Sequence, residues 1–172
     1  MPYRSESWLD PRLEGRPSGA AGRGLFAGAP IEACEIVTVW GGQVFSLDDI
    51  RRGKARDWAY IGEDRLLGSL TSDESEDPAD LLNHSCDPNL WMVDEVTLAA
   101  RREITPGEEL TGDYAMWEGN EDYVMPWACR CQSPLCRKAI TGRDWRLPKL
   151  QERYWDHFSP FMNERIRKLS RA

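Results

Sequence analysis

Four cysteines restrict the fold of this chain more than any other feature of its sequence. Cys129, Cys131 and Cys136 offer three thiolates within eight residues, and Cys86 offers a fourth from the middle of the chain. A closed, tetrahedral zinc site needs four such soft ligands. Because Cys86 and Cys129 are 43 positions apart, a shared Zn²⁺ ion would tie the late segment onto the central one. The sequence therefore predicts one structural zinc ion, with four unrelated buried thiols as the alternative.

The cell compartment decides between a metal and disulfides. No apolar run approaches the length of a membrane span, and residues 1–5 lack the apolar core of a signal peptide. We therefore expect an intracellular protein, cytoplasmic or nuclear, with no membrane partner. Reducing conditions there favour a metal over disulfides. The fifth cysteine, Cys34, lies in an apolar stretch and is expected to be a buried free thiol.

Composition and charge restrict the partners. The 172 residues include 41% hydrophobic ones, which suffices for one domain with its own core. The net charge of −7 disfavours direct binding of nucleic acid, because neutralising phosphates takes a surplus of lysine and arginine. A basic partner is favoured instead. The densest acidic run, residues 73–80, is either a solvated loop or a guide for a basic peptide.

Hydrophobic periodicity and turn residues predict a mostly β (α+β) protein with helices at its end. Ser46, with an acid three residues later, predicts a short helix over about 47–53. A helix is also expected from the spacing of Leu147, Leu150, Tyr154 and Phe158, and a second after Ser159-Pro160 with Met162, Ile166 and Leu169 on its apolar side. Strands or extended segments are predicted over 35–40, 43–45, 58–61, 65–70, 90–93, 96–100 and 109–114.

Three further motifs accompany the cysteines. They are Gly22-Arg23-Gly24 before a strand, the loop Asn83-His84-Ser85-Cys86-Asp87-Pro88-Asn89, and the stretch from Gly107 to Tyr114. Alone, each has an ordinary interpretation: a turn into a strand, a polar loop with a structural histidine, and a strand that ends on a core tyrosine. Loops that gather Asn, His and Cys, however, usually serve a site.

In this order, and with the C-x-C-x4-C tail, the motifs resemble the SET-domain family of protein-lysine methyltransferases, whose post-SET motif uses the same four-cysteine arrangement. The resemblance covers roughly residues 20–140. It implies a SET-like β-clip fold of short strands with a pseudoknot, plus C-terminal helices. The expected divisions are an N-terminal extension (1–19), a catalytic core (20–118), a post-SET zinc segment (119–140) and C-terminal helices (141–172). The cysteine-rich module that precedes many histone-modifying members is missing, so we expect a compact, stand-alone member.

The resemblance also implies an activity: transfer of a methyl group from S-adenosylmethionine to a lysine amine of a protein or peptide substrate, which the charge predicts to be basic. The protein must align amine, methyl and sulfur, and present the amine in its neutral form. Tyr114 matches the family's catalytic tyrosine. The residues implied to hold the donor are Gly22, Arg23, Gly24, Tyr60, Asn83, His84, Tyr114, Trp127 and Arg130.

Three residues depart from the family's pattern. Gly112 stands where many members have Phe or Tyr, Trp40 where a second tyrosine often lines the lysine channel, and Asp80 where an arginine is frequent. We therefore expect a rebuilt substrate channel, with Trp40, Trp91, Gly112 and Trp117 as candidates. The number of methyl groups added, the substrate and the oligomeric state stay open. So does the alternative of a catalytically inactive, zinc-stabilised module that binds a basic peptide.

Overall fold

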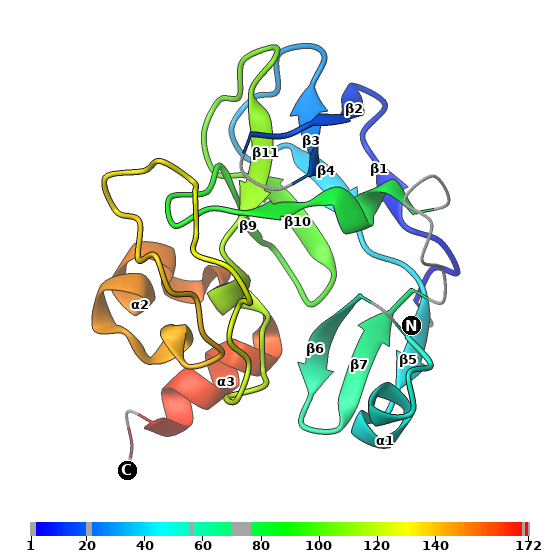
Figure 1. The fold of residues 1–172 in the computed structure, drawn as a ribbon, viewed down its shortest axis with the longest axis vertical. Helices are drawn as coiled ribbons and strands as arrows, with labels where there is room; N and C mark the ends of the chain where they lie inside the picture. The colour runs from blue at the N-terminus through cyan, green and yellow to red at the C-terminus, as the bar shows by residue number, and fades with distance from the viewer. Residues whose placement is uncertain (1–2, 20–21, 56, 70–76, 170, 172) are drawn as a thin grey trace.

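The computed structural model describes residues 3–19, 22–55, 57–69, 77–169 and 171. Short strands make up most of the regular structure, and the longer helices follow at the C-terminal end, which confirms the predicted fold class (Figure 1). The described residues contain no helix that is long and apolar enough to cross a membrane. Residues 73–76 of the predicted acidic run lie outside the described residues.

The strands form three small sheets. The first has the order β1 (Trp8–Leu9), β4 (Ile36–Val39), β10 (Thr97–Ala100) and β9 (Leu90–Met92). The second has the order β2 (Leu13–Pro17), β3 (Arg23–Ala27), β11 (Glu109–Gly112) and β8 (Asn83–His84). The third has the order β5 (Gln43–Phe45), β7 (Arg65–Gly68) and β6 (Trp58–Gly62). In Figure 1 this third sheet lies below the other two, across from the C-terminal helices.

The first 19 residues contribute edge strands to two of these sheets. β1 pairs with β4, and β2 pairs with β3 over five residues, from Leu13 opposite Ala27 to Pro17 opposite Arg23. Gly15 and Pro17 disfavour a helix here, but they are tolerated on an edge strand. The segment predicted as an extension is thus joined to the predicted core by backbone hydrogen bonds.

One parallel strand pair brings two of the sequence motifs together. In β8 and β11, Asn83 lies opposite Thr111, and His84 lies opposite Gly112. The backbone N–H of Ser85 extends this contact by donating to the carbonyl of Gly112 at 2.9 Å. The Asn-His-Ser-Cys loop therefore runs directly beside the strand that leads into Tyr114, a crossing consistent with the predicted pseudoknot.

The helices follow the predicted caps closely, with two differences. Ser46 and Asp49 form a complete capping box at α1 (Leu47–Arg51), and the Ser159 hydroxyl accepts from the Met162 N–H at the start of α3 (Pro160–Leu169). The helix predicted through Phe158 ends earlier, because Trp155 adopts φ +29° after α2 (Pro148–Tyr154). Leu169 was predicted on the apolar side, yet it is exposed. Single turns of 3-10 helix are η1 (Pro78–Leu81), η2 (Tyr114–Met116), η3 (Asp144–Arg146) and η4 (Trp155–His157).

A single main core joins the two four-stranded sheets to the C-terminal helices. Its largest fully buried side chains include Leu25, Ile31, Leu90, Leu98, Leu110, Met116, Tyr154 and Phe158. The prediction of a buried Cys34 is wrong. Its backbone turns at φ +70° before β4, and this turn leaves the thiol exposed.

Leu110→Ala tests the importance of β11, since this fully buried side chain packs into the main core. We expect a loss of about 2–5 kcal/mol in the free energy of unfolding, from lost burial and the cavity left behind. Urea denaturation followed by circular dichroism measures it. Leu169→Ala is the matched control, because Leu169 is 45% exposed, and its effect should stay within about 0.5 kcal/mol. Equal losses in the two variants would contradict this account of the core.

Candidate active site and metal centre

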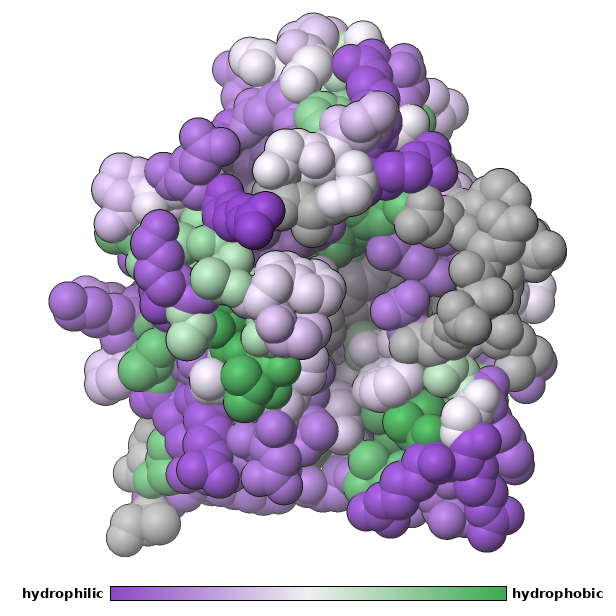
Figure 2. All heavy atoms as spheres, viewed as in Figure 1, coloured by the Kyte–Doolittle hydropathy of each residue, from purple (hydrophilic) through white to green (hydrophobic). Residues whose placement is uncertain are grey.

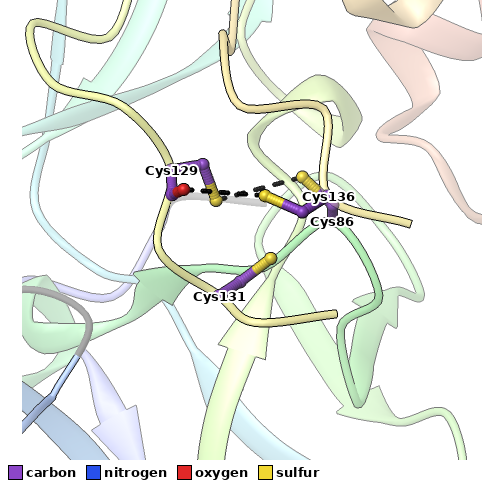
Figure 3. A group of neighbouring side chains, drawn as sticks. All are labelled: Cys86, Cys129, Cys131 and Cys136. Carbon is purple, nitrogen blue, oxygen red and sulfur yellow. Dashed lines mark hydrogen bonds between the residues drawn. The ribbon is translucent and has the colours of Figure 1, made fainter. Parts of the chain in front are cut away.

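The four cysteines predicted as metal ligands lie together. The sulfur atoms of Cys86, Cys129, Cys131 and Cys136 all lie within 4.8 Å of one another. Figure 3 shows the side chains reaching a common centre from two separate parts of the chain. Cys86 and Cys129 are buried, while Cys131 and Cys136 are partly exposed. The arrangement joins the late segment to the central loop, as the sequence predicts.

The geometry suits zinc. A tetrahedral ion with bonds of about 2.3 Å separates its sulfur ligands by roughly 3.8 Å, and the sulfur atoms of Cys86 and Cys129 are 4.0 Å apart. Four cysteine sulfurs form a soft donor set without carboxylates, which is typical of structural zinc. The Arg137 N–H also donates to the sulfur of Cys86 at 3.3 Å. The cluster therefore fits a closed metal site that holds no reactive water.

His84 connects this cluster to Tyr114. The Tyr114 N–H donates to Nδ1 of His84 at 3.3 Å, and Nε2 of His84 lies 3.4 Å from the sulfur of Cys86. Because Nδ1 accepts a hydrogen bond, the ring proton belongs on Nε2, where it is donated to the sulfur. Burial lowers the pKa of His84 to about 4, so the ring is neutral. Its side chain therefore orients a metal ligand on one side and Tyr114 on the other.

Asp113 anchors the same region through a fully buried carboxylate. It accepts two hydrogen bonds from the Arg137 guanidinium, at 2.7 and 2.8 Å, and one from the Tyr154 hydroxyl at 2.9 Å. It also caps η2 by accepting from the Ala115 N–H at 3.1 Å. The Arg137 guanidinium pairs with Asp144 as well, at 2.8 Å, while the backbone N–H of Arg137 donates to the sulfur of Cys86.

Tyr114 lies between two cavities. The larger holds about 310 Å³ and has an aromatic wall that includes Trp40, Trp58, Trp117 and Tyr123. The smaller holds about 30 Å³, roughly one water molecule, and is lined by Asn83, His84, Tyr114, Met125, Trp127, Cys129 and Arg130. Among the described residues, Tyr114 alone lines both cavities. Figure 2 shows the surface hollowed between the sheet of β5–β7 and the part of the molecule that carries the C-terminal helices.

The structure brings most, but not all, of the predicted donor residues together. Asn83, His84, Tyr114, Trp127 and Arg130 line the smaller cavity. The Asn83 side-chain amide donates to the carbonyl of Arg23 at 2.8 Å, which attaches the Gly22-Arg23-Gly24 segment to this side. Tyr60 lies elsewhere: its ring stacks on Phe161 of α3 at 6.4 Å and lines neither cavity.

Three of the residues predicted for the substrate channel, Trp40, Gly112 and Trp117, lie together. A Cβ at Gly112 would overlap the indole of Trp117, so the missing side chain is the space that this indole fills. Trp40 packs edge-on against Trp117, with ring centroids 5.1 Å apart. Trp91 does not join them, because it stacks on His157 with centroids 3.5 Å apart and lines neither cavity.

The larger cavity is acidic. Asp57, Asp80 and Glu118 line it, and its described lining contains no lysine, arginine or histidine. Burial raises the pKa of Glu118 to about 7. Burial, and then the neighbouring Asp77 and Asp57, raises the pKa of Asp80 to about 7. Negative charge here is therefore costly, and a bound cation would relieve that cost.

Sequence reasoning missed several residues of this region. Asp57, Glu118 and Tyr123 line the larger cavity from loops without a recognisable motif. Asp113 had a usable signal, because it directly precedes Tyr114 and ends a strand, where a carboxylate often caps the following turn. Its partners Arg137 and Tyr154 lie 24 and 41 positions later, and no local pattern indicates such pairings.

Comparison with known proteins identifies the class. Residues 22–115 match the SET domain, which is more than half of the chain, and the chain therefore belongs to the SET-domain family. Its relatives include histone-lysine N-methyltransferases. The chain is 38% identical over 94 residues to ash1 of Drosophila melanogaster, covering 49% of the chain and 4% of that protein. It is 36% identical over 134 residues to trithorax of Drosophila virilis, covering 69% of the chain and 3% of that protein.

A shorter relative has the same kind of name. The probable histone-lysine N-methyltransferase set-23 of Caenorhabditis briggsae is 30% identical over 140 residues, covering 69% of the chain and 56% of that protein. The chain thus spans only a small part of the long Drosophila proteins and about half of the shorter one. At the level of the family, the comparisons support methylation of protein lysines.

The metal centre predicts a specific difference among the five cysteines. Protein from zinc-replete medium should hold one zinc ion per chain, and Cys129→Ser should lose most of it because three sulfur ligands no longer close the site. Elemental analysis after gel filtration measures the metal. Cys34→Ser is the matched control, since Cys34 is exposed and lies outside the cluster. Equal zinc loss in the two variants would refute a four-cysteine site, and so would wild-type protein that contains no zinc.

Glu118 predicts a pH dependence of stability. Its pKa rises from 4.5 to about 7 on folding, so the folded chain retains a proton that the unfolded chain releases. Wild type should therefore lose stability as the pH rises from about 4.5 to about 7. Glu118→Gln stays neutral and should keep that stability. The difference in free energy of unfolding should be absent near pH 4 and complete above about pH 8. The exposed Glu152→Gln should show no such difference, and a difference largest at low pH would contradict the sign.

Proposed function

We propose that this chain transfers a methyl group from S-adenosylmethionine to the side-chain amine of a lysine in a protein substrate. One observation carries the proposal: Tyr114 lines both the cavity beside Asn83 and Trp127 and the aromatic cavity beside Trp40 and Trp117. A donor on one side and an amine on the other would meet at this tyrosine. In-line transfer between two bound partners is chiefly a matter of such positioning.

The donor side has fitting chemistry. Trp127 is 55% exposed and offers an indole face for the adenine ring, and the Arg130 guanidinium offers a partner for a carboxylate. Backbone groups of Asn83 and His84 complete this side, with Gly22, Arg23 and Gly24 behind them. S-adenosylmethionine would supply the activated methyl group. The small cavity admits only its reactive end, so most of the donor would lie on the surface beside Trp127.

The substrate side favours a neutral amine and an aligned methyl group. Aromatic walls from Trp40 and Trp117 exclude water, which disfavours the ammonium form of lysine. Burial raises the pKa of Tyr114, so its hydroxyl stays neutral near pH 7. That hydroxyl lies 3.4 Å from the carbonyl of Leu82, and the two oxygens form a polar pair that can hold a methyl group through C–H···O contacts.

The substrate is proposed to be a basic protein. Asp57, Asp80 and Glu118 line the aromatic cavity, and the described lining contains no lysine, arginine or histidine. The chain as a whole carries a net charge of −7. The relatives are named histone-lysine methyltransferases, so histones are the first substrates to try. Such a substrate agrees with an intracellular location, in the cytoplasm or the nucleus.

Tyr114→Phe tests the proposed role of the hydroxyl. Zinc-replete protein is incubated with methyl-labelled S-adenosylmethionine, recombinant core histones and a panel of lysine peptides, and the labelled residue is identified by mass spectrometry. The variant should lose activity about 10²-fold or more, because it removes a polar group from the transfer point. Tyr3→Phe is the control, since the Tyr3 hydroxyl donates to Glu95 at 2.8 Å and Tyr3 lines neither cavity. Folded wild type with neither labelling nor donor binding would overturn the proposal.

A further inference from the structure

The proposed function assigns no chemical step to Glu118, one of the carboxylates that line the larger cavity. We infer that Glu118 binds the substrate ammonium and accepts its proton before methyl transfer. This inference rests on the proposed function and assigns a step within it: the conversion of a charged lysine into a nucleophile. Lysine has an ordinary pKa near 10.4, so the amine arrives charged and must release a proton.

Position is the first argument. Glu118 lies one helical turn after Tyr114, and its N–H donates to the carbonyl of Tyr114 at 2.8 Å. Both side chains line the same aromatic cavity, together with Trp117 and Tyr123. Burial, and then the charge of Glu118, raises the pKa of Tyr123. Glu118 and Tyr114 therefore face the same space at the proposed point of transfer.

The bonding of Glu118 is the second argument. One carboxylate oxygen, Oε1, accepts from the Asn120 N–H at 2.7 Å and is thereby held in place. No lysine or arginine pairs with Glu118 in the described part of the chain. Arg165, which contacts the adjacent Gly119, donates to the carbonyl of Gly119 at 2.7 Å and pairs with Glu63 at 3.2 Å. The second oxygen is thus available to a cation that enters the cavity.

The surroundings of Glu118 favour proton acceptance. The ionisable groups that face it or share its cavity are Tyr60, Tyr114, Tyr123, Asp57, Asp80 and, behind Gly119, Arg165. Burial raises its pKa to about 7, while the same apolar walls lower that of an entering ammonium. The two pKa values therefore converge, which suits a general base that works near neutral pH.

The step is balanced. One N–H bond of the lysine ammonium breaks, and its proton forms an O–H bond with the Glu118 carboxylate. The amine keeps the electron pair and uses it to bond the methyl carbon, while the pair of the carbon–sulfur bond stays on the departing sulfur. The methylated amine emerges as an ammonium ion. Glu118 then returns its proton to water at the open side of the cavity.

Cation binding is tested without donor or protein substrate. Zinc-replete protein without donor is titrated with n-butylammonium chloride. A second titration uses 1-butanol as a neutral probe of similar length, and the indole resonances are followed by NMR in both. Wild type should bind the ammonium and show much weaker binding of the alcohol. Glu118→Gln should weaken ammonium binding at least tenfold, because it removes the charge-assisted hydrogen bond. The exposed Glu152→Gln should bind as wild type does.

Proton acceptance is tested by the pH dependence of methylation of recombinant core histones. Wild-type kcat/KM should rise through a limb near pH 7. Glu118→Gln should lose this limb, and its kcat/KM should be at least tenfold lower at pH 7. The kcat/KM should recover toward the wild-type value as the pH approaches the pKa of free lysine, about 10.4. A merely structural role would lower the rate at every pH. An Asp80→Asn variant that removes the limb, with Glu118→Gln retaining it, would overturn the assignment.

The two tests separate this inference from the proposed function. If ammonium binding depends on Glu118 but wild type transfers no methyl group, the proposed function and the proton-transfer step are both refuted. Only the binding of a cation by Glu118 would then remain supported. Methyl transfer with an unchanged Glu118→Gln profile and unchanged ammonium binding would retain the function and refute the role of Glu118.

Discussion

The Asp113 carboxylate holds together three parts of the molecule that are distant in sequence. It is fully buried, and a buried charge is costly unless it is paired and hydrogen-bonded. Arg137 of the cysteine-rich segment and Tyr154 of α2 provide that pairing. Asp113 also precedes Tyr114 and caps the turn that carries it. The position of the proposed catalytic tyrosine thus depends on Asp113. Its contacts with Arg137 and Tyr154 hold the segment of residues 129–136 and helix α2 against the end of β11.

The cluster of four cysteines reinforces the same junction by a second route. Cys86 belongs to the loop that pairs with β11, and the other three cysteines belong to the segment above it. His84 transmits the order of the cluster to Tyr114 through the two nitrogens of one ring, and Arg153 of α2 donates to the carbonyl of Cys86 at 2.9 Å. The cluster thus positions the residues that flank the smaller cavity, although it offers no ligand position for a substrate.

The unusual residues of the channel compensate for one another. Gly112 lacks a side chain, and the indole of Trp117 occupies the space that one would need. Trp40 supports that indole edge-on. Asp80 replaces a frequent arginine, and together with Asp57 and Glu118 it leaves the lining of the cavity negative. An aromatic wall beside carboxylates is a suitable environment for an amine that enters as a cation and reacts as a neutral group.

The sequence by itself determined the local features of this protein: the capping box at Ser46, the N-cap at Ser159, the order of the motifs, the four cysteines and Tyr114. The caps follow from short-range spacing and backbone geometry, and the cysteine set follows from ligand chemistry. Only the tertiary structure decided which distant side chains meet. It joined Trp8–Leu9 and Leu13–Pro17 to two sheets, stacked Trp91 on His157, exposed Cys34, and paired Asp113 with Arg137 and Tyr154. Such contacts arise when separate elements pack into one core. The residue pattern of a single segment does not specify which distant segment will pack against it.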